Sequence, residues 1–441
     1  MRFSTLAGLA SLAVYVSADL TPITIKGNAF YAGNDRFYVR GVDYQPGAAS
    51  DPKDPLADPK ICGRDIPALK DLGVNAIRVY IIDSAANHDE CMKQLSDAGI
   101  YLILDVNTPR QSISRANPSG SYNEVYLQHV FGTMDVFSKY ANTMAFFAGN
   151  EVVDKPDNTA AATYVKATVR DMKAYQKARK LRAIPVGYSA ADVTSNRQLI
   201  AEYMNSGPDA ERVDFHAYND YSWCGTGSSF TFSGYDQKVK NYTDYGIPTF
   251  LSEFGCNKFL PRTFPEIEAI YSTQMTGVFS GGLVYEWTQE ENKFGLVKVS
   301  QDLKSIELMD DYKNLKSQYQ KTPNPNGDAG ATLTPGKASK CPSKVPGIWD
   351  AECTLPDMPA KAKGYLDSGA GQVLGFSGPT NQWDTPGTPS SGSGTGTASS
   401  AAKTTSAKNS ASGPLPAVNF AAIASIGSIV LAGIFGGAAL L

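Results

Sequence analysis

The 441-residue chain has few of the residues that metal, phosphate and nucleic-acid chemistry require. Its three histidines, His88, His129 and His216, show no ligand spacing to a cysteine, so zinc is the weaker alternative for the cysteines. A formal net charge of −3 and no basic cluster interleaved with aromatics argue against a nucleic-acid partner. Phosphate loops, dinucleotide fingerprints and the G-x-S-x-G elbow are missing, so we expect no cofactor, no metal and no serine triad.

The cysteines are only six, and none forms a C-x-x-C pair. An even number in a chain with secretory features favours disulfides, for which fifteen connectivities exist. Proximity along the chain suggests three pairs: Cys62 with Cys91, Cys224 with Cys256, and Cys341 with Cys353.

The two ends of the chain resemble processing signals. Residues 1–18 combine Arg2 with an uncharged, mostly apolar run to Ala18, which predicts a cleaved signal peptide. Residues 384–414 are Ser/Thr-rich, with 14 Ser or Thr between positions 385 and 412, and predict a disordered stalk. Residues 415–441 carry no charge and predict a GPI-attachment signal, with Asn409 as attachment site and a single-pass anchor as the alternative. An N-glycosylation acceptor stands at Asn241.

Between residues 36 and 298, β-rich runs alternate with amphipathic segments, which predicts an α/β fold, a (β/α)8 TIM barrel spanning 19–321. A connector and small disulfide-tied appendage would follow at 322–383. The expected strands are 38–44, 75–82, 101–106, 145–151, 184–188, 212–218, 248–254 and 282–287. The expected helices are 64–72, 88–98, 123–140, 161–179, 196–204, 236–244 and 265–275.

Two of these strands end in a glutamate, Glu151 on the fourth and Glu253 on the seventh. Polar residues often merely terminate a strand. Barrel active sites, however, lie at the carboxyl ends of the strands, so two strand-end glutamates in one barrel favour a catalytic role. A glycosidic bond is cleaved by one carboxylic acid that protonates the leaving oxygen and a second carboxylate on the other side. Glu151 and Glu253 are therefore candidate catalytic residues, with Asn150 placed to bond a ring hydroxyl.

Aromatic and charged residues surround them at other strand ends. Aromatic faces can stack on sugar rings, although two or three of these should serve packing only. The cluster comprises Tyr44, Tyr80, Tyr218, Tyr221, Trp223, Tyr285 and Trp287. Arg78 is expected to form a buried ion pair with Glu253, and His216 to be a hydrogen-bonded strand histidine rather than a base.

These residues stand in longer stretches that together are specific. They are 41–47 (GVDYQPG), 75–80 (NAIRVY), 147–152 (FAGNEV), 221–225 (YSWCG), 252–256 (SEFGC) and 281–286 (GGLVYE). From residue 19 to the tail, the chain resembles the fungal β-1,3-glucanosyltransferases of glycoside hydrolase family 72, which are anchored to the plasma membrane by GPI.

The resemblance implies that Glu151 is the general acid/base and Glu253 the nucleophile of a retaining mechanism. It also implies a set of glucan contacts and a substrate loop over 107–115, in which Ser114 departs from the expected asparagine. The implied contacts are Gln45, Tyr80, Asp105, Asn107, Ser112, Arg115, Asn150, Asp192, Arg197, Tyr221 and Tyr285.

The implied reaction cleaves an internal β-1,3 bond and passes the new reducing end to the non-reducing end of another glucan chain, which lengthens wall glucan at the outer face of the membrane. With only Cys341 and Cys353 after the barrel, the chain resembles the subgroup without a cysteine-rich carbohydrate-binding module. Many relatives have another cysteine near Asn205, so the resemblance leaves the partner of Cys341 open. A non-catalytic glucan receptor and an extracellular glucan hydrolase are the alternatives.

Overall fold

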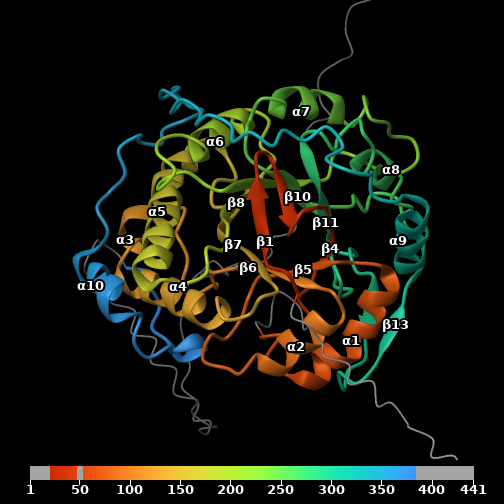
Figure 1. Ribbon diagram of the computed structural model, residues 1–441, viewed down its shortest axis with the longest axis horizontal. Coiled ribbons are helices and arrows are strands. Elements are labelled where there is room, and N and C mark those ends of the chain that lie inside the picture. Colours follow the sequence, from red (N-terminus) through yellow and green to blue (C-terminus); the bar gives the residue numbers. More distant parts are fainter. Residues whose placement is uncertain (1–19, 47–52, 384–441) are drawn as a thin grey trace, which may run out of the picture. The chain divides into compact units, whose positions relative to one another are not determined.

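The computed structural model describes residues 20–46 and 53–383, in which eight parallel strands close into a barrel (Figure 1). Each strand pairs with the next along the chain, and the last pairs with the first. In order they are β4 (Val39–Asp43), β5 (Ala76–Val79), β6 (Tyr101–Asp105), β7 (Thr143–Asn150), β8 (Val186–Ala191), β9 (Phe215–Asp220), β10 (Thr249–Phe254) and β11 (Phe279–Val284). The predicted TIM barrel is confirmed, although β9 ends two residues later than expected.

Helices surround the barrel and follow the predicted segments, except that α8 is short and that α3, α9 and α10 were not predicted. They are α1 (Pro59–Leu72), α2 (Asp89–Asp97), α3 (Pro118–Ser121), α4 (Glu124–Phe137), α5 (Ala162–Arg179), α6 (Arg197–Met204), α7 (Tyr235–Tyr242), α8 (Glu266–Ile270), α9 (Asp310–Lys321) and α10 (Ala360–Ser368), with 3₁₀ turns η1 (Pro156–Ala161) and η2 (Gly375–Ser377). Helix α1 shows how the sequence sets such ends: the Asp58 side chain caps its first turn, and Gly73, at φ 85°, takes the left-handed conformation that ends it. Over the described ranges, every helix is too short or too polar to span a bilayer.

Apolar side chains fill the barrel from its amino-terminal end. The antiparallel strands β1 (Ile23–Lys26), β2 (Ala29–Ala32) and β3 (Asp35–Phe37) form a small sheet there, which the sequence patterns did not reveal. Phe30 of this sheet makes edge contacts with Phe215 and Phe250, with ring centroids 5.8 and 5.9 Å apart. The interior at this end is therefore packed core, and functional side chains have to come from the other end of the strands.

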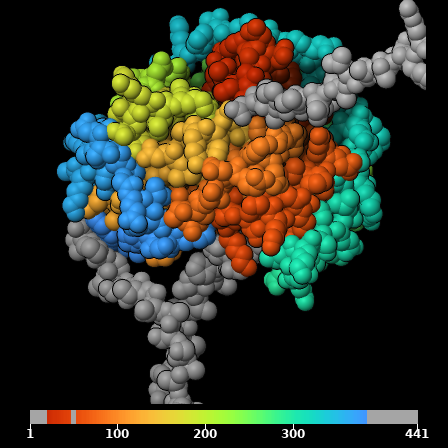
Figure 2. Space-filling view, turned by 60° about the horizontal axis from the view of Figure 1, so that its bottom comes forward, coloured from red at the N-terminus to blue at the C-terminus, as the bar shows by residue number. Residues whose placement is uncertain are grey.

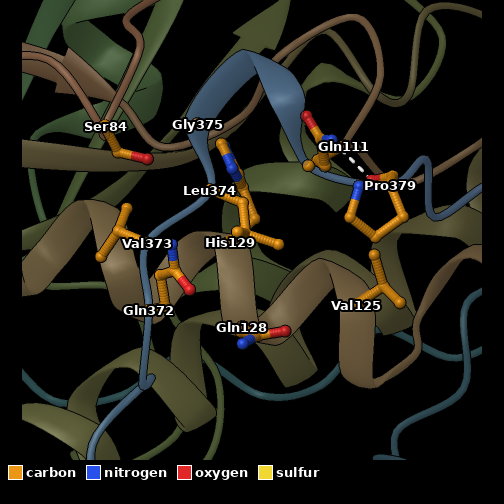
Figure 3. A pocket seen from close by; sticks show the side chains of 11 residues that line it. Ser84, Gln111, Val125, Gln128, His129, Gln372, Val373, Leu374, Gly375 and Pro379 are labelled. Carbon is orange, nitrogen blue, oxygen red and sulfur yellow. Dashed lines mark hydrogen bonds between the residues drawn. The ribbon is translucent and has the colours of Figure 1, made fainter. Parts of the chain in front are cut away.

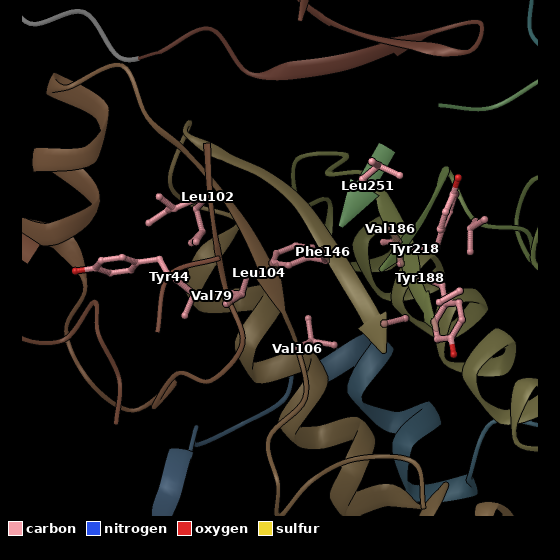
Figure 4. Close-up of a cluster of buried hydrophobic side chains, with 14 of the residues drawn as sticks. Tyr44, Val79, Leu102, Leu104, Val106, Phe146, Val186, Tyr188, Tyr218 and Leu251 are labelled. Atoms are coloured by element: carbon pink, nitrogen blue, oxygen red, sulfur yellow. The ribbon is translucent and has the colours of Figure 1, made fainter. Parts of the chain in front are cut away.

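A second layer of apolar side chains lies between strands and helices. Figure 4 shows Leu102, Leu104 and Phe146 in this layer, all fully buried. Ile103, between the two leucines, belongs to the interior cluster instead. This alternation is the period of two expected of a strand that buries both faces.

After α9, residues 322–383 wrap around the outside of the barrel rather than forming a separate globule (Figures 1 and 2). The amide of Gly336 donates to the carbonyl of Gly246, after α7, and that of Ser339 to the carbonyl of Asn205, after α6. Farther on, the Glu352 amide donates to the Thr163 hydroxyl on α5, and α10 packs against α4 and α5. A two-stranded sheet of β12 (Val297–Val299) and β13 (Ile306–Leu308) lies between β11 and α9.

Three disulfides are present, joining the pairs that proximity along the chain suggests: Cys62–Cys91, Cys224–Cys256 and Cys341–Cys353. The predicted signal peptide, stalk, apolar tail and attachment site Asn409 lie outside the described residues.

Candidate active site

Glu253, near the end of β10, receives three hydrogen bonds from its surroundings. The hydroxyls of Tyr80 and Tyr221 donate to its carboxylate at 2.8 and 2.7 Å, and the Arg78 guanidinium does so at 3.4 Å. Tyr80 and Tyr221 directly follow β5 and β9, so the ends of two other barrel strands deliver these donors. Because all three stabilise a negative charge, the geometry favours the ionised form of Glu253.

Arg78 is completely buried and lies close to more than one carboxylate. Its guanidinium binds Asp105 through two nitrogens, at 2.8 and 3.1 Å, so Asp105 and not Glu253 is its closest partner. Asp43 lies 3.9 Å away, and its oxygens find no hydrogen-bond partner among the described residues. Burial raises the pKa of Asp43 well above its usual value, although Arg78 opposes the rise.

Glu151 directly follows β7 and has an unusual backbone. Its φ of 47° lies in the left-handed region, which costs energy for a residue with a side chain and is found mainly at functional sites. The Glu151 amide donates to the carbonyl of Ser189 at 2.8 Å, and its own carbonyl accepts from Arg115 at 2.5 and 3.2 Å. These contacts hold the strained residue in place. Its carboxyl accepts a 2.8 Å hydrogen bond from the Asn219 amide.

The two glutamates titrate in one electrostatic environment. Burial raises the pKa of Glu253 to about 7, a rise opposed by Arg78 and by the hydroxyls of Tyr221 and Tyr80 and reinforced by Glu151. Burial also raises the pKa of Glu151, opposed by Asn219. Two interacting carboxyls share their titration. The three side-chain donors on Glu253, against one on Glu151, favour Glu253 as the ionised member of the pair.

A hydrogen-bond network between strands connects the two glutamates. Asn219 donates to Glu151 and accepts from Ser252 at 2.9 Å, next to Glu253 in the chain. Asn150 accepts from Ser189 at 2.7 Å in the same network. Sequence reasoning missed Asn219 because it ended the strand at Tyr218; the polar residues that follow were the available signal.

Aromatic side chains form part of the rim. Phe294 lies 5.4 Å from the ring of Tyr221 and 5.3 Å from that of Tyr285. Tyr44, Tyr218 and Trp287 of the predicted cluster are instead almost completely buried and pack in the core. The expectation that some members serve packing only is met.

The remaining expected contacts are engaged with the protein itself. The amide of Gln45 donates to the Lys53 carbonyl and accepts from the Ile81 amide, and Asp192 and Arg197 form an ion pair after β8. Asn107 donates to the Ala148 carbonyl and accepts from the Tyr126 hydroxyl. Ser112 and Arg115 lie on the loop after β6.

His216 differs from expectation, because it lies on β9 with both ring nitrogens unpartnered by any described residue. Burial lowers its pKa to about 3, so the ring is neutral. In the part of the chain that the structure describes, no group of His, Cys, Asp and Glu could hold a metal ion.

Comparisons with known proteins show the family of the chain. The family model described as glucanosyltransferase, of glycoside hydrolase family 72, matches residues 12–323. Among curated relatives, 1,3-β-glucanosyltransferase gel1 of Aspergillus fumigatus is 54% identical over 371 residues, which cover 84% of this chain and 81% of gel1. The 1,3-β-glucanosyltransferase GAS5 of Saccharomyces cerevisiae is 54% identical over 380 residues, which cover 85% of this chain and 78% of GAS5.

Solved structures show the same fold. Saccharomyces cerevisiae Gas2p in complex with laminaritriose and laminaritetraose superposes with a TM-score of 0.73 at 41% identity, covering 78% of each chain. A variant of Gas2p in complex with laminaritetraose and laminaripentaose gives 0.72 at 39% identity, covering 78% of this chain and 76% of that one. With this match over most of its length, the chain belongs to the 1,3-β-glucanosyltransferases of glycoside hydrolase family 72.

Proposed function

We propose that the chain elongates β-1,3-glucan by a retaining double displacement in which Glu253 is the nucleophile and Glu151 the general acid/base. The observation that carries this assignment is the unequal number of donors: Tyr80, Tyr221 and Arg78 all donate to Glu253, whereas Asn219 is the side-chain donor on Glu151. A nucleophile has to be ionised and an acid protonated, and this arrangement favours both.

In the first step, Glu151 gives its proton to the glycosidic oxygen while a Glu253 oxygen attacks the anomeric carbon. The bond to the leaving glucan breaks, and the new reducing end stays on Glu253 as an ester. In the second step, the hydroxyl at the non-reducing end of another glucan loses its proton to Glu151 and attacks the same carbon. Glu253 leaves as a carboxylate, so configuration is retained and one chain is longer.

Water could take the place of the acceptor hydroxyl, which would give hydrolysis. Tyr221, Tyr285 and Phe294 form an aromatic wall beside Glu253 on which an acceptor sugar could stack, and a held acceptor gains over water through proximity. We assign further glucan contacts to the cleft: Gln45, Tyr80, Asp105, Asn107, Ser112, Arg115, Asn150, Asp192 and Arg197.

The test incubates the chain from residue 19 to 406 with a reduced β-1,3-gluco-oligosaccharide and follows product sizes by chromatography. Products longer and shorter than the substrate are expected from the wild type and from neither Glu151→Gln nor Glu253→Gln. Glu266→Gln is the matched control, because burial also raises the pKa of Glu266 to about 7 although this residue lies on α8. Products that are only shorter would indicate a hydrolase, and a folded wild type without products a glucan receptor.

A fluoride donor separates the two roles. Fluoride leaves without protonation, so a β-laminaribiosyl fluoride should form the glycosyl-enzyme in Glu151→Gln but not in Glu253→Gln. The covalent intermediate is read by mass spectrometry of the intact protein. The opposite pattern would exchange the two roles.

We propose secretion followed by GPI anchoring at Asn409 on the outer face of the plasma membrane, because residues 1–18 have the pattern of a signal peptide and residues 415–441 that of a GPI-attachment signal. Asn241, exposed on α7, is the proposed N-glycan site. The cysteine count after the barrel supports assignment to the subgroup without a carbohydrate-binding module. Release of the full chain from membranes by a phosphatidylinositol-specific phospholipase, lost in Asn409→Gln, would support the anchor; retention of the wild type after treatment would argue for a spanning segment.

A further inference from the structure

The end of the described tail lies against the loop that follows β6. We call residues 374–383 the clasp. Figure 3 shows the approach to this contact: residues from Gln372 to Pro379 lie beside Gln128 and His129 of α4, and Gln111 of the loop donates to the Pro379 carbonyl at 2.7 Å. The two segments are more than 260 residues apart in sequence, so only the folded chain brings them together.

Asn381 is the centre of the clasp and is fully buried. Its amide oxygen accepts from the Ser112 amide at 3.1 Å, and its amide nitrogen donates to the carbonyls of Ser112 and Ser121 at 2.9 and 2.6 Å. The Asn123 side chain donates to the Asn381 carbonyl at 2.8 Å. One side chain thus pairs with both backbone groups of Ser112, as a neighbouring β-strand would.

The loop has little regular structure to hold its own shape. Residues 106–117 contain neither helix nor strand, and the backbones of Thr108 and Gln111 bond each other across the turn at 108–111. Around it, the clasp supplies further bonds: Thr380 donates to the Arg110 carbonyl at 3.0 Å, and Arg110 donates to the Phe376 carbonyl at 2.9 Å. The clasp therefore fixes the outer side of the loop.

The inner side of the same loop touches the proposed acid/base. Three residues after Ser112, Arg115 donates to the Glu151 carbonyl at 2.5 and 3.2 Å and pairs with Asp154 at 2.9 Å. Glu151 is the residue with a φ of 47°, so its orientation depends on such contacts. Hydrogen bonds therefore connect Asn381 to Ser112, and Arg115 to Glu151, and the three-residue stretch from Ser112 to Arg115 joins the two sets.

We infer that Asn381 is a positioning residue for catalysis, which acts through the loop and Arg115 to hold the backbone of Glu151. The inference rests on the proposed role of Glu151. The clasp thus supports the active site from outside, without touching the reacting atoms itself.

The test compares Asn381→Ala with Thr163→Val in the chain from 19 to 406. Thr163→Val removes a part-buried 2.9 Å hydrogen bond from the Glu352 amide of the tail to Thr163 on α5, away from the loop. Hydrogen exchange of the Ser112 amide should speed up in Asn381→Ala only. The kcat for oligosaccharide transfer should fall by roughly tenfold to a hundredfold in Asn381→Ala and stay near wild type in Thr163→Val.

Two further readouts separate positioning from simple loss of stability. Glycosyl-enzyme formation from β-laminaribiosyl fluoride, which does not need the acid, should be nearly as fast in Asn381→Ala as in the wild type. In an Arg115→Ala background, adding Asn381→Ala should lower kcat by less than twofold, because the two residues act on one path. If Asn381→Ala does not fold, Asn381→Asp, which loses the two amide donors at nearly equal size, takes its place.

Faster exchange at Ser112 with unchanged kcat would overturn the inference and leave the proposed function intact. An equal loss of rate with the oligosaccharide and with the glycosyl fluoride would also overturn it. So would losses of kcat from Asn381→Ala and Arg115→Ala that add up fully in the double variant. A wild type without transfer products would instead remove the proposed function, whatever the exchange rates show.

Discussion

At the residue scale, three carboxyl groups of the site lie close to a single cation, the guanidinium of Arg78. Asp43, Asp105 and Glu253 all lie within 4 Å of Arg78, which is completely buried. Asp105 receives the two shortest bonds from Arg78, Glu253 is supported by two tyrosine hydroxyls, and burial raises the pKa of Asp43. The charge on Glu253 is therefore set by hydrogen bonds from tyrosines as much as by Arg78.

The tyrosine donors predict a specific pH dependence. The Tyr221 hydroxyl lowers the pKa of Glu253, so Tyr221→Phe should raise this pKa. Because Glu253, as the proposed nucleophile, has to attack as a carboxylate, the acidic limb of kcat/KM should move to higher pH, and kcat/KM at neutral pH should fall about tenfold. A pH–rate profile of oligosaccharide transfer measures both.

Tyr44→Phe is the matched control, since the Tyr44 hydroxyl donates to buried Asp65 at 2.9 Å and not to Glu253. It should lower stability and leave the acidic limb where it is. An acidic limb that moved equally in both variants, or that moved to lower pH in Tyr221→Phe, would contradict the assignment of Glu253 as the ionised partner.

At the element scale, strand ends carry the site and loops complete it. Tyrosines that directly follow β5, β9 and β11, and the carboxyl of the residue after β7, lie at one end of the barrel. The Cys224–Cys256 disulfide links the segment after β9, in which Tyr221 lies, to the segment after β10, the strand that carries Glu253. Cys62–Cys91 links α1 to α2 on the outside.

These two disulfides allow a comparison at nearly equal loop length. They close 32 and 29 residues, so removing either with paired Cys→Ala changes should cost about 3–4 kcal/mol of the free energy of unfolding. At a temperature where both variants are folded, only loss of Cys224–Cys256 should reduce kcat, by about tenfold. Denaturant unfolding and transfer assays read the two quantities. Equal activity of the two variants would show that this disulfide does not order the site.

At the scale of the whole molecule, the catalytic barrel extends beyond its last helix. The predicted boundary at Lys321 coincides with the end of α9, but residues 322–383 cover the barrel surface (Figure 2). Trp349 packs against Tyr203 of α6 with ring centroids 5.4 Å apart, and Ala362 of α10 is fully buried. The barrel and its tail therefore share one hydrophobic core.

A truncated chain tests this. Residues 20–321 alone would expose the apolar surface around Tyr203 and the faces of α4 and α5. We therefore expect this shorter chain to bind a hydrophobic dye and to lose cooperative unfolding. Residues 20–383 should unfold in one transition. Calorimetry and dye fluorescence are the measurements. An equal melting temperature for both chains would show that the tail is an independent attachment.

Local pattern was enough to predict the barrel, the strand-end positions of the two glutamates and the Cys62–Cys91 and Cys224–Cys256 disulfides, because strand length, strand-end chemistry and proximity along the chain all lie in short stretches of sequence. Proximity also suggested Cys341–Cys353, but only the structure decided the partner of Cys341. Only the tertiary structure decided that Asp105 is the main partner of Arg78, that Asn219 serves Glu151, and that Asn381 holds the loop at Ser112. Each of these contacts joins residues far apart in the chain. Their geometry depends on barrel closure and on the course of the tail, which no periodicity or spacing encodes.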